Sequence, residues 1–234
     1  RAQSGGAWAS VELLRVVDDK CQALFDNCFK VIDGPTAPDI TIRELDQRLI
    51  FFLSNSPNSN NYKEGYKEFD PNIIQPLPGG DGDSSDPYYR FEGYQIFQLA
   101  NAEVSVEELH DPDRARLIAQ FDIKNGVTKI VNYEFDEFIG FVVPIVEVVG
   151  NDNGIQHSFE ILQDAFATGE SALVNNRTYY YLALAYAYNN YLDFGLDFPN
   201  SQGQTMPYLA GRKNIGDKTN NFKPYEAMPH RIVN

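Results

Sequence analysis

Positively charged residues are scarce in this chain of 234 residues, which contains 19 Lys and Arg against 33 Asp and Glu. The formal net charge is therefore −14 at pH 7. Nucleic-acid-binding proteins need clustered Lys and Arg to contact phosphates, and anionic membrane surfaces attract the same side chains. The charge balance argues against both partners. It is typical of an extracellular protein or of a calcium-rich setting.

The sequence also lacks a long hydrophobic segment. A membrane-spanning helix needs about 20 predominantly apolar residues in a row. The longest apolar stretch here, residues 141–149, is interrupted by Pro144 and Glu147. We therefore predict no membrane insertion. The chain begins at Arg1 without a methionine, which indicates a piece cut from a longer protein.

Motifs for catalysis and for transition metals are absent from the sequence as well. It has no Gly-x-Ser-x-Gly turn, phosphate-binding loop or dinucleotide-binding glycine pattern. His110, His157 and His230 are far apart, and no spacing of His or Cys is typical of a metal site. Neighbouring carboxylates occur, but in so acidic a chain they are more often surface charge than an acid–base pair. We expect a protein that is not an enzyme and that has no cofactor, unless calcium binds.

Only two cysteines are present, Cys21 and Cys28. If their segment is looped, they can form a disulfide. In a continuous helix their separation corresponds to a rise of about 10 Å, beyond the Cα distance of about 7 Å that a disulfide tolerates. Two small buried thiols are then the alternative, and both interpretations stay open.

Aromatic residues, glycine and proline are abundant, with 14 Tyr, 16 Phe, 17 Gly and 13 Pro. This composition favours strands joined by many turns. Residues 89–98 and 178–189 are dense in aromatic and aliphatic side chains, contain no proline and end at turn-type residues. We predict that these two segments are the central strands of a β-sandwich.

Alternating or continuous apolar patterns predict the other strands. We expect strands at residues 39–45, 48–54, 89–99, 115–123, 127–135, 155–162 and 178–188, and short extended pieces near 208–210 and 225–228. The turn signal Lys124-Asn125-Gly126 predicts that the strands on either side of it pair with each other. Residues 141–149 should continue the sheet, and residues 54–86 should form a long loop.

The aromatic strand at 178–188 is apolar on both faces. A sheet with one face in water would alternate apolar and polar residues, whereas Leu182, Leu184 and Tyr186 lie on one face and Tyr181 and Ala183 on the other. We infer that both faces are covered. The C-terminal tail, residues 198–232, is the expected second cover, and the N-terminal segment, an insertion or a neighbouring subunit are the alternatives.

The succession of strands resembles the fibronectin type III family. The resemblance covers residues 35–190 and is most specific at Phe91-Glu92-Gly93-Tyr94-Gln95-Ile96-Phe97 and at Tyr179-Tyr180-Tyr181. It implies an all-β fold, a fibronectin type III or immunoglobulin-like β-sandwich, here with long insertions because such domains have on the order of 100 residues. Residues 23–27 and 207–212 resemble parts of large exported surface proteins of Bacteroidetes-type bacteria, which implies an extracellular or cell-surface location.

The expected domain organisation has three parts. Residues 1–33 should be the partly helical C-terminal tail of an upstream unit, since apolar residues recur there at helical spacing, although residues 11–17 also suit a strand. Residues 34–38 contain Pro35 and Pro38 and should form a stiff linker. Residues 39–234 should form the enlarged sandwich.

The acidic loop at residues 79–86 is the best local candidate for a metal site. Asp81, Asp83 and Asp86 alternate with small residues, as in loops that wrap calcium. The twelfth position counted from Asp81 is Glu92, which lies in a predicted strand, so the loop is not an EF-hand. A solvated acidic turn is the alternative interpretation.

Aromatic residues in polar segments, namely Tyr62, Tyr66, Tyr191 and Phe194, are candidates for binding. Such rings suit stacking on a sugar or docking to a partner, and the alternative is that they pin loops to the sandwich. We predict a non-catalytic spacer, adhesion or assembly module of a large secreted bacterial surface protein. Its partners would be neighbouring domains of the same polypeptide or other surface proteins. An accessory domain of a secreted enzyme that binds a glycan or a protein is the alternative.

Overall fold

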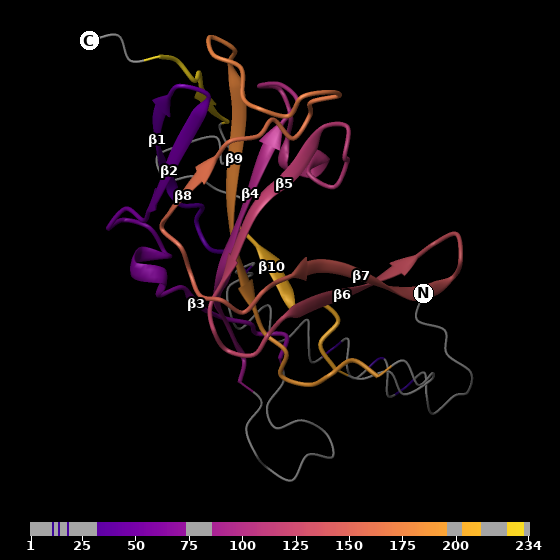
Figure 1. Cartoon of the computed structure of the whole chain (residues 1–234). Helices are drawn as coiled ribbons and strands as arrows, with labels where there is room; N and C mark the ends of the chain where they lie inside the picture. The colour runs from indigo at the N-terminus through magenta and orange to yellow at the C-terminus, as the bar shows by residue number, and fades with distance from the viewer. Residues whose placement is uncertain are drawn as a thin grey trace.

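The computed structural model describes residues 32–73, 86–195, 203–211 and 224–231, together with Val11, Leu14 and Asp18, which are helical. Within these residues the chain forms eleven strands and two short 3₁₀ helices (Figure 1). The fold is an all-β sandwich, as the sequence predicts.

One sheet of the sandwich has three antiparallel strands in the order β1-β2-β8. β1 (Asp39–Leu45) and β2 (Arg48–Ser54) form a tight hairpin, and Gln47 in its turn has a φ of 52°. β8 (Ser158–Ile161) pairs with the other edge of β2 and is shorter than expected. Leu49, Phe51 and Leu53 alternate with more exposed residues, so one face of β2 is directed at the core.

The second sheet is built around the two aromatic segments. They form β4 (Tyr88–Leu99) and β9 (Tyr179–Tyr188), which pair antiparallel as central strands. Each has two partners on its outer edge. β3 (Lys67–Phe69) and β5 (Ala115–Asp122) pair with β4, while β10 (Tyr208–Ala210) and β11 (Tyr225–Ala227) pair with β9.

The main core lies between these two sheets. Tyr181, Ala183 and Ala185 of β9 belong to the same buried cluster as Leu49 and Phe51 of β2. The rings of Phe51 and Tyr181 meet edge to face, with centroids 4.9 Å apart. On this face of β9 the large side chains of Tyr179 and Tyr181 lie at one end of the strand, and the small Ala183, Ala185 and Ala187 follow.

Two insertions cover the other face of β9. Leu182 and Leu184 pack with Val104 and Leu109 of the β4–β5 connection. The 3₁₀ helix η2 (Val106–Glu108) lies in this connection, and a capping box at Ser105 closes its first turn.

Further along β9, the second cover comes from a hairpin. Tyr186 packs with Ile130 and Val148, and the C-terminal tail adds Tyr208 to this cluster. The described parts of the tail otherwise form edge strands of the sheet. Among the described residues, insertions between the strands and Tyr208 of the tail thus cover this face together. Residues 198–202 and 212–223 of the expected cover lie outside the described residues, so their part in it stays a prediction.

The pairing predicted from the Lys124-Asn125-Gly126 turn is also wrong. β5 pairs with β4, whereas β6 (Lys129–Asp136) pairs with β7 (Phe141–Val149) in a separate two-stranded sheet. The backbone N–H groups of Asn125 and Gly126 donate to Asp152 Oδ1 at 2.7 and 2.9 Å. The turn is thus tied to another loop, and the chain leaves the sandwich instead of folding back on β5. For the same reason β7 does not continue the sandwich sheet.

The proline-rich residues 34–38 lie against the sandwich. Pro35 and Pro38 are buried, and the Tyr66 hydroxyl donates to the Asp33 carbonyl oxygen at 2.6 Å. Gly34 lies so close to the backbone of Ala210 that a Cβ added there would collide with it. This segment is fixed beside β10, and the division into domains stays a prediction.

Candidate functional site

The predicted calcium loop lies mostly outside the described residues, and of its three aspartates only Asp86 is described. Asp86 Oδ2 accepts a hydrogen bond from Arg90 Nη2 at 2.6 Å, and Oδ1 accepts one from the backbone N–H of Tyr88 at 3.2 Å. The Asp86 carboxylate thus fixes the start of β4. Within the described ranges no three or more His, Cys, Asp or Glu side chains are arranged to hold a metal ion. Calcium binding by Asp81, Asp83 and Asp86 stays a prediction.

Cys21 and Cys28 also lie outside the described residues, so their disulfide stays a prediction. The histidines are dispersed over the fold. His157 Nε2 lies 2.7 Å from Glu64 Oε1, and His230 Nδ1 lies 3.5 Å from Glu44 Oε2. In the part of the chain that the structure describes, no helix is long and apolar enough to cross a bilayer.

The four aromatic residues predicted to bind occupy different environments. Tyr66 is buried and anchored through its hydroxyl, so it pins its loop to the sandwich. Tyr62, in the 3₁₀ helix η1 (Tyr62–Glu64), is 43% exposed, and Lys63 Nζ lies 5.4 Å from the centre of its ring. Tyr191 and Phe194 are partly buried and line one cavity beside β10. The structure therefore brings together only the last two.

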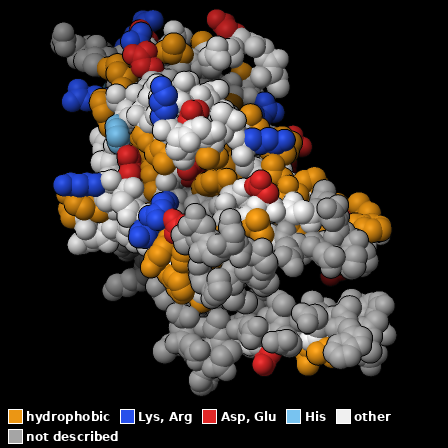
Figure 2. Space-filling model, turned by 90° about the horizontal axis from the view of Figure 1, so that it is seen from below, with side chains coloured by type: hydrophobic (Ala, Val, Ile, Leu, Met, Phe, Trp, Pro, Cys, Tyr) orange, Lys and Arg blue, Asp and Glu red, His pale blue; other side chains and the backbone are white. Residues whose placement is uncertain are grey.

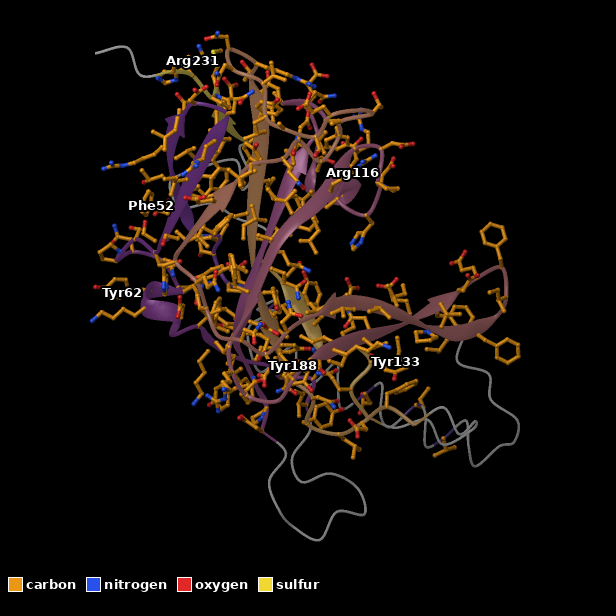
Figure 3. All side chains as sticks on the ribbon, in the orientation of Figure 1. Phe52, Tyr62, Arg116, Tyr133, Tyr188 and Arg231 are labelled. Carbon is orange, nitrogen blue, oxygen red and sulfur yellow. The ribbon has the colours of Figure 1, made fainter. Side chains whose placement is uncertain are left out.

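A large exposed apolar surface lies elsewhere, on the hairpin of β6 and β7. This hairpin, which we call the arm, extends away from the sandwich (Figure 1). At its tip, Phe135, Phe138, Ile139 and Phe141 are 64%, 102%, 60% and 70% exposed. Hydrophobic side chains mark the right edge of the molecule in Figure 2, and aromatic rings stand apart at the end of the arm in Figure 3.

The base of the arm is anchored to the sandwich. Ile130 and Val148 are buried with Tyr186 and Tyr208. Asn132 is buried beside them, and its Oδ1 accepts the backbone N–H of Tyr208 at 2.9 Å. Apolar packing and a buried hydrogen bond together fix the direction in which the arm leaves the sheet.

Only acidic charges accompany the aromatic rings of the tip. Glu134, Asp136 and Glu137 lie in or next to the turn, and no Lys or Arg occurs from residue 130 to residue 149. Asp136 Oδ1 accepts the backbone N–H groups of Phe138 and Ile139 at 2.8 and 3.1 Å. These hydrogen bonds fix the backbone of the turn, and the Phe138 ring stands in solvent. The tip combines apolar surface with negative charge.

The arm could not be recognised from the sequence, because its strands show the same patterns as strands inside a sheet. One signal was present in the sequence: the turn Asp136-Glu137-Phe138-Ile139-Gly140 places two large apolar residues where a hairpin normally carries polar ones. Glycine is required in that turn, since Gly140 has a φ of 74°.

A polar cluster connects the sandwich to the segment that leads into the arm. Glu92 and Asp122 are buried on β4 and β5. Asp122 Oδ2 accepts the backbone N–H of Asp152 at 3.0 Å, and Asn125 donates to Glu92. Burial raises the pKa of Glu92 to about 7, and the nearby charges of Asp122 and Asp152 add to the rise. These contacts join loops that are distant in sequence, which is a structural role.

No known protein family, curated protein or solved structure matches this chain. Two surfaces in the described residues are suited to contact another molecule: the tip of the arm, and the cavity lined by Tyr191 and Phe194.

Proposed function

We propose that the chain is a non-catalytic adhesion or assembly module of an exported bacterial surface protein, and that the arm tip docks into another protein domain. The observation that carries this proposal is the exposure of Phe135, Phe138 and Phe141 at the end of an anchored hairpin. The resemblance of the strand succession to fibronectin type III domains and the acidic composition support the exported location.

Free energy favours burial of the tip by a partner. A lone two-stranded hairpin is marginally stable in water, so the tip gains little from its own fold. Full burial of a Phe side chain contributes roughly 1.5–3 kcal/mol. Aromatic residues are also enriched at the centres of protein interfaces, where a few side chains supply most of the binding energy. The tip has the composition of such a centre.

The charge of the tip determines the kind of partner that fits it. Glu134, Asp136 and Glu137 flank the apolar residues, so a complementary surface is an apolar groove with Lys or Arg at its rim. A second copy of this chain is a poor partner because both copies have a net charge of −14 and arm-to-arm contact brings carboxylates together. The expected partner is therefore a neighbouring domain of the same polypeptide, or another surface protein, that carries such a groove.

Cysteine labelling tests the proposal without knowledge of the partner. In a background in which Cys21 and Cys28 are replaced by serine, Phe138→Cys should react with a maleimide in the isolated chain. It should be protected in the intact protein on cells. Leu162→Cys is the control, because Leu162 is also exposed (48%) but lies beyond β8, away from the arm, and should react in both settings. Equal labelling of position 138 in both settings contradicts the proposal.

A further inference from the structure

A cavity of about 410 Å³ lies beside the start of β10. Its walls come from the segment after β3, from β4, from the β9–β10 connection and from β10 itself. Small-molecule sites have volumes of roughly 300–1,000 Å³ and combine apolar walls with a few placed polar groups. The cavity falls within this range, and the arm tip takes no part in it.

Aromatic rings form part of the wall and are positioned from outside the cavity. The Phe194 ring packs against Tyr133 with centroids 4.8 Å apart. The backbone N–H of Tyr191 donates to Asn189 Oδ1 at 3.0 Å. Asn189 is itself buried, and its Nδ2 donates to the carbonyl oxygen of Tyr88 at 2.9 Å. The place of the Phe194 ring and the backbone position of Tyr191 are therefore set without a ligand.

Buried polar side chains line the same cavity. Asp70, Tyr89 and Gln204 are 6%, 3% and 7% exposed. Tyr89 Oη donates to the Met206 carbonyl oxygen at 2.5 Å and accepts from Gln204 Nε2 at 3.0 Å. Asp70 Oδ1 accepts the backbone and side-chain N–H groups of Asn72 at 2.8 and 3.0 Å. These contacts fix the polar groups while leaving each oxygen the capacity for more than one hydrogen bond.

The lining selects among ligand classes. No Lys, Arg or His belongs to the described residues that line the cavity, so it offers no cation to a phosphate, sulfate or carboxylate. Burial raises the pKa of Tyr191, and the charge of Asp70 adds to the rise, so the hydroxyl stays protonated as a donor. Asn72, Gln204 and Thr205 supply neutral donors and acceptors, which suit ligand hydroxyl groups better than an aliphatic chain.

We propose that this cavity binds a neutral saccharide. The C–H face of a sugar ring packs on Tyr191 or Phe194, and its hydroxyl groups exchange hydrogen bonds with Asp70, Tyr89 and Gln204. Such a site makes the module a glycan-directed adhesin, independently of what the arm docks to.

An array of immobilised neutral and acidic oligosaccharides, probed with the whole chain, tests this inference. We expect retention on a subset of the neutral glycans. Titration calorimetry with a retained glycan should then show at least a tenfold loss of affinity for Phe194→Ala. Tyr62→Ala is the matched control, since it removes an exposed aromatic ring that lies on the other side of the molecule from Tyr133 (Figure 3). Its affinity should equal that of the unaltered chain.

Phe194→Ala also removes the packing of this ring on Tyr133, so a loss of affinity alone does not separate a binding role from a structural one. A second measurement therefore uses the unaltered chain. In NMR spectra of the unaltered chain, the amide signals of residues 203–206 should shift when the retained glycan is added, and that of Tyr62 should not. Choline serves as a separate probe, since a quaternary ammonium ion also suits aromatic rings beside a carboxylate. The inference is overturned if only acidic glycans or choline bind, if no glycan is retained, or if the shifts map elsewhere. The maleimide labelling of Phe138→Cys tests only whether the arm tip docks to a partner, and its outcome does not affect the saccharide proposal.

Discussion

The side-chain N–H groups of Asn125 donate to both carboxylate oxygens of Glu92, at 3.0 and 2.9 Å. Glu92 lies on a central strand and Asn125 in the turn that follows β5, so this contact joins the sandwich to the segment that leads into the arm. Burial raises the pKa of Glu92 to about 7 from an ordinary value of 4.5. Between these two values the folded chain keeps a proton that the unfolded chain has lost.

Stability should therefore fall as the pH rises from 4.5 to about 7. Below this window Glu92 is protonated in both states, and above it the buried carboxylate carries its full desolvation cost. Glu92→Gln removes the titration, so its melting temperature should match that of the unaltered chain at pH 4 and exceed it by about 3–6 °C at pH 8. Thermal melts at both pH values check this, with Glu107→Gln at an exposed position as the control. If the melting temperature of Glu92→Gln exceeds that of the unaltered chain by the same amount at both pH values, the titration of Glu92 does not cause the pH dependence.

Two buried tyrosines beside the base of the arm differ in what their hydroxyl groups contact. Tyr208 Oη donates to Gln95 Oε1 at 2.9 Å, whereas Tyr186 Oη has no hydrogen-bond partner among the described residues. Tyr208→Phe should lower the free energy of unfolding by about 1 kcal/mol, because it strands a buried acceptor. Tyr186→Phe should be neutral or stabilising, since it removes an unsatisfied group. Urea unfolding measures the free energy of unfolding of both variants. If both lose the same free energy, this interpretation of the two hydroxyl groups is wrong.

The central strands could be predicted from the sequence because their signal is local and strong. Residues 89–99 and 178–188 are long, aromatic and free of proline, and they became β4 and β9. The strands at residues 39–45 and 48–54 were equally clear from their apolar patterns. In the structure they pair as β1 and β2, from Asp39 opposite Ser54 to Leu45 opposite Arg48.

The partner of β5 could not be predicted, because the deciding contacts are distant in sequence. An Asn-Gly turn favours a local hairpin, but Asn125 binds Glu92 and Asp152 instead. The cavity could not be predicted from the sequence for the same reason. Tyr191 and Phe194 are detectable from their polar surroundings, whereas Gln204 meets Tyr89 across 115 positions of sequence. Nothing in the local sequence around Tyr89 indicates that contact.

Gly93 lies where two neighbouring strands approach β4 closely. The pairing of β4 with β9 shifts register between Phe91 and Gly93, and a Cβ added at Gly93 would collide with the backbone carbonyl oxygen of Phe121. It would also come within 2.6 Å of Tyr186 Oη. A backbone atom in a paired strand cannot move aside, so Gly93→Ala should destabilise the chain by about 3 kcal/mol or more.

Gly169→Ala is the control for this prediction. Gly169 has nothing within 4 Å of an added Cβ, so the substitution should leave the melting temperature unchanged or raise it slightly. Thermal melts of the two variants provide the comparison. A mild effect of Gly93→Ala would mean that β4 and β5 are not packed as closely as described.

The tip and the base of the arm should respond in opposite ways to truncation. Phe138 is 102% exposed, so Phe138→Ala should change the free energy of unfolding by less than about 0.5 kcal/mol. Ile130 is buried with Val148 and Tyr186 at the base, so Ile130→Ala should cost about 2–4 kcal/mol. Urea unfolding of the isolated chain measures both. If Phe138→Ala is as costly as Ile130→Ala, the ring is buried within the chain itself and is not free to dock. If it is neutral, any loss of assembly that this variant causes in the intact protein comes from the interface, because the fold is unchanged.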